Sequence, residues 1–273
     1  MNKWIWLRQY GVYLLQLYWE RRSYRTALVL STVSGVVGMA QFALMGVFLR
    51  EGNTFPGIEQ YGGDVVSYLL SGTIFTGFVA ISLHSFSSTV QEEQMAGTLE
   101  AVADSPAGIL RVMIFSAVTG FIGTVVGSIL MMGLFSFLLG FDLNINVGAV
   151  IISLVLTLLA LGGFGMAGCG VVLVTKKGDP ITWTVLTAMT LLSGVLYPIT
   201  VLPQWLQTVS HFLPTTTALD LVRSSLLNSA SVTGTLSASL PLVGWAALSV
   251  PLGAALLRWG LLTSRRRGSL GQY

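Results

Sequence analysis

Charged side chains are scarce in this sequence. Asp, Glu, Lys and Arg together make up 9% of its 273 residues, whereas soluble domains carry about a quarter. Long apolar runs take their place, and the mean hydropathy is +0.77. A soluble globular domain is therefore excluded. Six windows contain no charged residue at all: 26–49, 65–90, 112–141, 143–175, 181–219 and 224–257.

The charge-free windows predict an all-α integral membrane protein. A transmembrane helix needs about 20 apolar residues, and a backbone exposed to lipid must satisfy its own hydrogen bonds. We therefore expect one transmembrane helix in each window, and the whole chain, residues 1–273, forms a single transmembrane domain. We place the six spans at 27–49, 65–89, 108–139, 149–174, 181–200 and 239–261.

The sequence has a single cysteine, and its first residues lack the pattern of a signal peptide. Cys169 is the one cysteine, which excludes an internal disulfide, and we predict a small packing residue within the fourth span. Residues 1–25 have neither an uninterrupted apolar core nor a small-residue cleavage site. They are typical of an amphipathic helix in the membrane interface, with a basic flank and the aromatic residues Trp4, Trp6, Tyr18 and Trp19.

Basic residues are almost absent from one side of the predicted membrane. All Lys and Arg residues except Arg50 and Arg223 lie before the first span, in the second and fourth loops, or towards the C-terminus. The positive-inside rule therefore predicts that both termini are cytoplasmic, in a cell (inner) membrane. The net charge of +3 follows from this topology, so we expect contacts with membrane lipids and none with nucleic acid.

The residues that catalysis or ATP binding would need are missing. No Walker A pattern and no Gly-Lys pair occur, so a phosphate-binding loop is excluded. No H-E-x-x-H and no carboxylate pair within a span is present, and His84 and His211 fall on opposite sides of the membrane. We therefore expect no catalytic residue, metal site or cofactor in this chain. His84 is the one candidate for a proton relay, although a lone His at a helix end is more typical of a packing or interfacial group.

One short polar segment, 91–106 (QEEQMAGTLEAVADSP), interrupts the apolar windows. Met95, Leu99 and Val102 recur at i, i+4 and i+7, which predicts one helix with a single apolar stripe. Glutamates give the helix an acidic side. Periodicity alone leaves two interpretations open: a surface that docks a partner, or a solvated loop helix that packs against the neighbouring spans.

Prolines divide the segment 201–238, on the other side of the membrane, into short pieces. Pro203 and Pro214 predict a hairpin of two short helices on or in the outer leaflet. Asp220 and Arg223, three residues apart, are predicted to form an exposed pair on the second helix, worth less than about 1 kcal/mol.

Prolines also mark two helix starts on the cytoplasmic side. Ser105-Pro106 and Asp179-Pro180 each place a side-chain cap before a proline. The fixed φ of proline suits the first helical position. Both pairs precede a predicted span, which supports the topology.

The polar segment and the outer hairpin together resemble one known family. The pattern Glu93-x-x-x-Gly97-Thr98-Leu99-Glu100, then Val102 and Ser105-Pro106, is similar to the loop after the second of six spans in type-two ABC exporter permeases. The hairpin before the last span is similar as well, in Tyr197-Pro198, Leu202-Pro203, Leu213-Pro214, Asp220 and Arg223. The departures are Gln94 and Met95, where an Arg and a Glu are common, and Val102 for the usual Leu before Ser-Pro.

The resemblance implies a mechanism and partners. Two permeases, identical or related, would form a dimer, and each would dock its coupling segment on one of two cytoplasmic ATPase subunits that bind ATP and Mg²⁺. Closure of the ATPase pair would move the docked helices and open a path outward. The residues implied for coupling are Glu92, Glu93, Met95, Gly97, Thr98, Leu99, Glu100, Val102, Ser105 and Pro106; those of the outer hairpin are Pro198, Pro203, Pro214, Asp220 and Arg223.

The resemblance also places a translocation path at the dimer interface, largely between the first, second and fifth spans. Two faces that mix hydroxyl and aromatic side chains at helical spacing suit an amphipathic solute. The alternative is that they are helix-packing surfaces, where small and hydroxyl residues are common. The candidates are Ser71, Phe75, Phe78 and Ser82 in the second span and Trp183, Thr187, Thr190 and Tyr197 in the fifth.

The expected function is therefore export of a hydrophobic or amphiphilic substrate, drug-like or lipid-like, because no charge lies deep in either face. Within the class, the alternatives are export of a lipid-linked polysaccharide or glycolipid, or of sodium. Outside it, the alternatives are a secondary carrier and a membrane scaffold.

Overall fold

The computed structural model describes residues 8–15, 19, 25–50, 58, 64–105, 108–140, 144–175 and 180–266. Within these ranges every regular element is a helix, which confirms the predicted all-α class. Five helices are long and apolar enough to cross a membrane. They are α2 (Arg25–Arg50), α3 (Val65–Met95), α5 (Gly108–Leu139), α6 (Val147–Thr175) and α11 (Leu240–Arg266).

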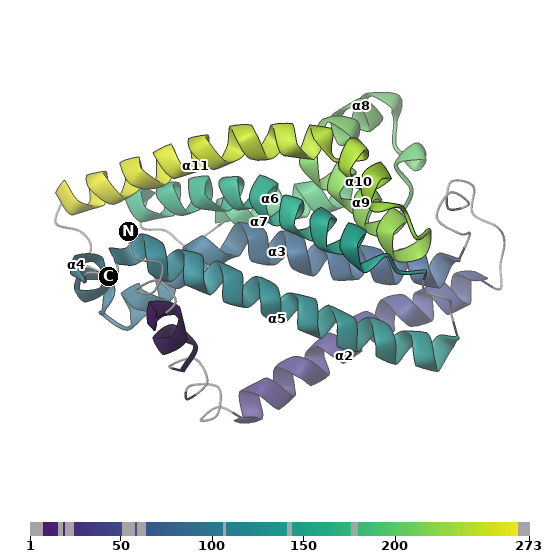
Figure 1. Ribbon diagram of the computed structural model, residues 1–273, viewed down its shortest axis with the longest axis horizontal. Helices are drawn as coiled ribbons and strands as arrows, with labels where there is room; N and C mark the ends of the chain where they lie inside the picture. The colour runs from purple at the N-terminus through teal and green to yellow at the C-terminus, as the bar shows by residue number, and fades with distance from the viewer. Residues whose placement is uncertain are drawn as a thin grey trace.

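Most of the short elements lie towards the two ends of this bundle. Figure 1 shows α4 and the last turns of α11 at one end, and α8 to α10 towards the opposite end. This separation agrees with the predicted topology, in which the coupling segment and the outer hairpin lie on different sides. The short elements are α4 (Leu99–Asp104), α7 (Pro180–Leu192), the 3-10 turn η2 (Ile199–Val201), α8 (Gln204–Phe212), α9 (Pro214–Leu227) and α10 (Val232–Ala238).

The fifth predicted span is shorter than expected. We predicted a helix over 181–200, but α7 ends at Leu192 and has 13 residues. At about 1.5 Å per residue it covers about 20 Å, less than the roughly 30 Å of a hydrocarbon core. Gly194 follows with φ +78°, outside the helical region, and turns lead from there to η2. The prediction of one continuous helix was therefore wrong at its outer end.

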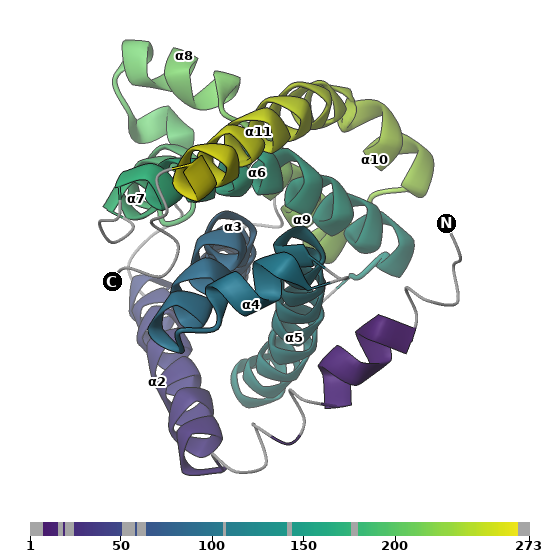
Figure 2. The ribbon, with the colours of Figure 1, turned by 90° about the vertical axis from the view of Figure 1, so that its left-hand side faces the viewer.

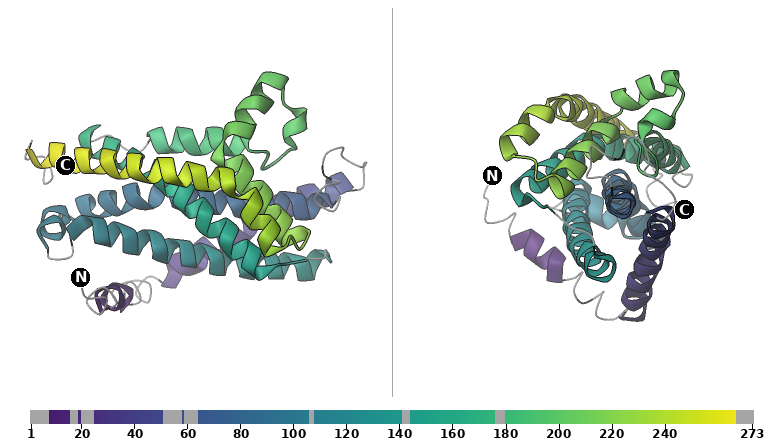
Figure 3. Two further views of the ribbon diagram at one scale, coloured as in Figure 1. Left: turned by 45° about the horizontal axis from the view of Figure 1, so that its top comes forward. Right: turned by 90° about the vertical axis from the view of Figure 1, so that its right-hand side faces the viewer.

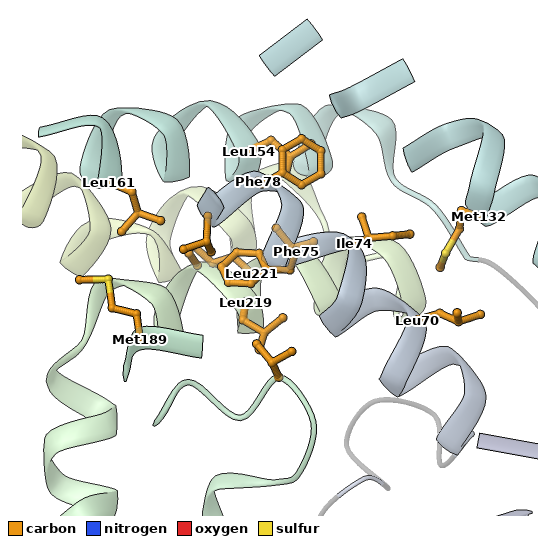
Figure 4. Close-up of a cluster of buried hydrophobic side chains, with 14 of the residues drawn as sticks. Leu70, Ile74, Phe75, Phe78, Met132, Leu154, Leu161, Met189, Leu219 and Leu221 are labelled. Atoms are coloured by element: carbon orange, nitrogen blue, oxygen red, sulfur yellow. The ribbon is translucent and has the colours of Figure 1, made fainter. Parts of the chain in front are cut away.

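Helix α3 is the centre of the fold. Figure 2 shows it with α2, α5, α6 and α9 around it, and α4 across the inner end of the bundle. Its Phe75 and Phe78 are at most 2% exposed. Figure 4 shows them facing side chains of α6 and α9, and Phe78 also makes an edge-to-face contact with Phe121 of α5 at 5.5 Å between ring centroids. By contrast, the outward faces of α2 and α5 are exposed and apolar, as expected of surfaces in lipid.

Helices α6 and α11 pack side by side because small residues line their contact. A Cβ on Gly253 would lie 2.1 Å from the carbonyl oxygen of Gly163, so the backbones approach too closely for any side chain. Small residues allow such approach in membrane helices. Ser249 of α11 reinforces the contact by donating to the Ala160 carbonyl at 2.7 Å. Cys169 of α6 is buried and contacts the Phe86 carbonyl of α3, so the predicted packing role is confirmed.

Part of the predicted interfacial helix is described. Residues 8–15 are helical, and Figure 3 shows them beside α5. The Tyr10 ring lies 5.2 Å from that of Phe115, and Arg111 of α5 donates to the side chain of Gln9 at 3.2 Å. Trp19 is 61% exposed, which suits an interfacial aromatic residue. The other three predicted interfacial aromatic residues, Trp4, Trp6 and Tyr18, lie outside the described residues.

Candidate functional site

The polar segment after the second span is two helices and not one. Helix α3 continues to Met95, and the chain then turns at Gly97, whose φ is +68°. The amide of Thr98 donates to the carbonyl of Glu93 at 2.9 Å and that of Gly97 donates to Gln94 at 3.0 Å. This pair of bonds is the Schellman motif, in which glycine supplies the left-handed residue just after a helix. No atom lies within 4 Å of a Cβ built on Gly97, so the glycine is needed for the bend and not for close packing.

The turn separates residues that we predicted to share one face. Met95 is 82% exposed, whereas Leu99 is 2% exposed. The predicted apolar stripe of Met95, Leu99 and Val102 was therefore wrong, because the left-handed residue at Gly97 redirects the chain between the first two. Met95 remains on the surface, and Leu99 begins the separate helix α4.

Leu99 anchors α4 to the bundle. Its side chain belongs to a buried group that we call the inner cluster, and Val102 packs against the same group. The cluster draws on α3, α5, α6 and α11, and α4 itself, a helix of six residues, packs against α5 and α3. The other members of the inner cluster are Phe86, Val90, Ile109, Met113, Ala117, Cys169, Leu173 and Leu257.

The polar side chains of the segment divide into structural and exposed ones. The Thr98 hydroxyl donates to the carboxylate of Glu93, which fastens the turn. Glu92 and Glu100 are exposed. Met95 and Thr98 are exposed as well, so four of the predicted coupling side chains lie on the surface of the described part of the segment.

Ser105 joins α4 to α5. Its hydroxyl donates to the Val102 carbonyl at 2.7 Å and accepts from the amide of Gly108 at 3.2 Å. The predicted side-chain cap is thus confirmed at Ser105, while Pro106 lies outside the described residues. For the second predicted cap, α7 begins at Pro180 as expected, and Asp179 lies outside the described residues.

A pocket of about 420 Å³ lies between α2, α3 and the outer half of α7. Three predicted path residues of the fifth span, Thr187, Thr190 and Tyr197, line it. Among the described residues that line the pocket, none carries a charge. The remaining lining residues are Phe42, Thr73, Thr76, Gly77, Ala80, Leu191, Val195 and Leu196.

The pocket corrects the path prediction on α3. Ser71, Phe75, Phe78 and Ser82 are at most 2% exposed and pack inside the subunit, so they do not line an open path in this conformation. The face of α3 that borders the pocket is the one that carries Thr73, Thr76, Gly77 and Ala80. The sequence did not discriminate between the faces because α3 carries hydroxyl side chains on both. Trp183 of α7 is 64% exposed and is not part of the lining.

The pocket hydroxyls are bound to their own helices. Thr73 donates to the Leu69 carbonyl at 2.8 Å, and Thr76 donates to the Gly72 carbonyl at 3.1 Å. Thr187 and Thr190 make the same i−4 bonds on α7, each at 2.9 Å. With their hydrogen atoms engaged in this way, the threonines keep only acceptor capacity for a solute. The lining is therefore apolar with a few acceptor oxygens.

Arg223 is buried, contrary to the prediction of an exposed pair. Its side chain is 1% exposed, and Asp220 is half-buried. The guanidinium lies 3.6 Å from the centroid of the Tyr68 ring. It donates to the carbonyls of Gly194 at 3.0 Å, Val195 at 3.0 Å and Tyr68 at 3.2 Å, and to the Ser71 hydroxyl at 3.3 Å. The prediction was wrong about exposure, because the guanidinium lies inside the bundle and binds mainly backbone carbonyls that are distant in sequence.

The two helices of the outer hairpin differ in exposure. On α8, Trp205 is 69% and Phe212 73% exposed, and Figure 3 shows α8 standing away from the bundle. Helix α9 instead packs into the bundle, where most of its side chains are buried. The prolines mark starts as predicted: Pro198 precedes η2, Pro203 precedes α8 and Pro214 begins α9. The two predicted short helices are therefore present, but α9 is packed against the spans.

The comparisons with known proteins give one family match. The model of the family described as "ABC-2 type transporter" matches residues 12–227. The matched range contains the Gly97 turn, α4, the pocket and Arg223. No curated protein sequence matches the chain significantly.

Proposed function

The chain belongs to the ABC-2 type transporter family, and from this premise we propose that it exports a hydrophobic or amphiphilic substrate. It is the permease subunit of an ABC transporter, a multi-pass membrane protein that associates with an ABC ATPase subunit. We infer two permeases, identical or related, with two ATPase subunits in a cell (inner) membrane and both termini in the cytoplasm.

The attachment of Leu99 is the observation that supports coupling through the polar segment. Exposed Glu92, Met95 and Glu100 offer the ATPase an acidic surface with one apolar side chain. A displacement of α4 acts directly on α5 and α3, which α4 contacts, and reaches α6 and α11 through the inner cluster, to which Leu99 belongs. A close-packed interior transmits such shifts instead of absorbing them.

The uncharged pocket supports the cargo class. Its volume of about 420 Å³ falls within the roughly 300–1,000 Å³ of small-molecule sites. An apolar lining with acceptor oxygens suits a drug-like or lipid-like molecule better than a sodium ion, which needs several converging oxygen ligands. A polymer of sugars needs a continuous channel, and the pocket is confined to the outer half of α7.

Co-purification and ATPase assays test this function. The permease is purified in detergent together with the products of neighbouring genes, and ATP hydrolysis is measured for wild type and for Met95→Glu. We expect an ATPase subunit to co-purify and the variant to lose most of the stimulated activity, because Met95→Glu replaces the one apolar contact of this surface by a charge that would have to be desolvated at the interface. Val232→Glu is the matched control, since Val232 is an exposed apolar residue of α10 at the opposite end.

Two outcomes would contradict the proposal. A protein that purifies without any ATPase favours a secondary carrier, in which case transport survives without the ATPase and fails without a proton gradient. An ATPase that binds through the segment but shows no cargo-dependent turnover favours a scaffold.

A further inference from the structure

A fully buried guanidinium holds the outer end of the broken helix α7. Arg223 of α9 reaches across to Gly194 and Val195, which follow the last residue of α7. Its remaining donors go to the Tyr68 carbonyl and the Ser71 hydroxyl of α3. One side chain therefore ties three elements together: α9, the segment after α7, and α3.

The reason for this contact lies in the interruption of α7. A helix end leaves carbonyls without intrahelical donors, and buried polar backbone groups need partners inside an apolar bundle. The Gly194 carbonyl accepts from Arg223 and also from the Tyr68 hydroxyl, at 2.7 Å. The Leu191 carbonyl accepts from the Tyr197 hydroxyl at 2.7 Å. Side chains thus replace the helical donors that the break removes.

The same segment forms one wall of the pocket. Val195, Leu196 and Tyr197 line it, opposite Thr73, Thr76 and Gly77 of α3. The segment lies directly on α3 at Gly72, where a Cβ would be 2.3 Å from the Val195 carbonyl oxygen. Arg223 and Gly72 therefore act on the same atom: one binds the Val195 carbonyl and the other leaves room for it.

We propose that Arg223 is a positioning residue for the pocket, which holds the segment 194–197 against α3 and so sets the affinity for cargo. It acts through the backbone of this segment and is not part of the pocket lining. The inference rests on the proposed function, in which this pocket takes an amphiphilic cargo. It adds a specificity-determining contact that lies outside the lining and belongs to the outer hairpin.

The planar guanidinium is the feature that the contact requires. Its fixed fork reaches both carbonyls of the segment and α3 at the same time, whereas an ammonium is a single point donor. Arg223→Gln removes the charge and shortens the reach, so the segment should be released. Arg223→Lys keeps the charge and some of the bonds, so an intermediate result is expected. Gly72→Ala should displace the segment although Arg223 remains.

The test uses the full chain in its complex with the ATPase, in detergent, with two readouts. The first is the dissociation constant of the fluorescent probe N-phenyl-1-naphthylamine. The second is the rate at which N-ethylmaleimide modifies the cysteine introduced by Val195→Cys in a Cys169→Ser background. Val195 is 3% exposed, so this rate reports release of the segment. Gly127→Ala on α5 is the control, because a Cβ at Gly127 has no neighbour within 4 Å.

We expect Arg223→Gln and Gly72→Ala to weaken probe binding about tenfold or more. At a temperature well below the melting temperature of each variant, both should also raise the rate of cysteine modification. Arg223→Lys should fall between these variants and wild type, and Gly127→Ala should match wild type. A lower melting temperature with an unchanged dissociation constant and an unchanged modification rate would overturn the inference, since Arg223 would then be a stability contact only. A wild-type complex that exports no cargo would count against the proposed function and not against this inference, because neither readout requires ATP.

Discussion

Met95 and Leu99 are four residues apart in the chain but lie in opposite environments: the Met95 side chain is 82% exposed and the Leu99 side chain is 2% exposed. The left-handed residue Gly97 stands between them. One side chain is therefore available to a partner, and the other fixes α4 to the bundle. A coupling element needs both properties, an exposed contact and a rigid attachment, and the turn provides them within a few residues.

Substitution of the two residues by alanine should have different effects. Leu99→Ala removes a buried side chain from the inner cluster and should cost about 2–5 kcal/mol of stability, seen as a clearly lower melting temperature in detergent. Met95→Ala removes an exposed side chain and should change the melting temperature little, while it weakens stimulation of the ATPase. Thermal denaturation and ATPase assays of both variants measure this difference. Equal melting temperatures for the two variants would show that Leu99 is not an anchor.

The Gly97 turn should tolerate asparagine better than valine. At φ +68° a β-branched residue is strained, by roughly 1–2 kcal/mol, whereas Asn enters the left-handed region more readily. Space is not the obstacle, because no atom lies within 4 Å of the added Cβ. We expect Gly97→Val to reduce the coupling of ATP hydrolysis to transport and Gly97→Asn to retain most of it. If both variants lose coupling equally, the backbone conformation is not the reason for the glycine.

The predicted topology is open to direct labelling. In a Cys169→Ser background, Glu92→Cys and Ser231→Cys place single cysteines at exposed positions on opposite ends of the bundle. A membrane-impermeant maleimide added to intact cells should modify the second and not the first. Both should react after the cells are opened, which controls for intrinsic reactivity. The reverse pattern would place the termini outside and would exclude docking of a cytoplasmic ATPase on α4.

The spans were predictable because their physical requirement is simple. A helix that crosses a bilayer must be long and without charge, and windows such as 65–90 and 143–175 show both features in the sequence. The side-chain cap at Ser105 and the helix start at Pro180 were also predicted, since capping chemistry is local. The break after Leu192 was missed because the apolar run continues past it, and hydropathy does not mark the left-handed Gly194 that follows.

The side-chain contacts of the site were harder to predict. Arg223 was predicted on the surface, but its hydrogen-bond partners are 28 to 155 residues away in the chain, and most are carbonyl groups that every residue has. The correct face of α3 was missed for a related reason: which hydroxyl face is buried depends on the neighbours α5, α6 and α9. The Gly97 turn, by contrast, had a signal, since a glycine just after the last residue of a helix is a common stop.

Filling the pocket should block cargo without loss of the fold. Thr76 lines the pocket and is partly exposed, so Thr76→Phe places a ring in a space of about 420 Å³ and should weaken binding and transport of an amphiphilic dye by about tenfold or more. Thr208→Phe on α8 is the matched control, because Thr208 is exposed and makes the same i−4 hydroxyl bond, to Gln204 at 3.2 Å.

Basal ATP hydrolysis should stay near wild type in both variants, since α4 and the inner cluster are untouched. Uptake into inverted membrane vesicles, with ATPase activity on the same preparation, measures both quantities. Transport that is unchanged in Thr76→Phe would move the cargo path away from this pocket, while loss of basal hydrolysis would mean that the pocket is part of the coupling machinery itself.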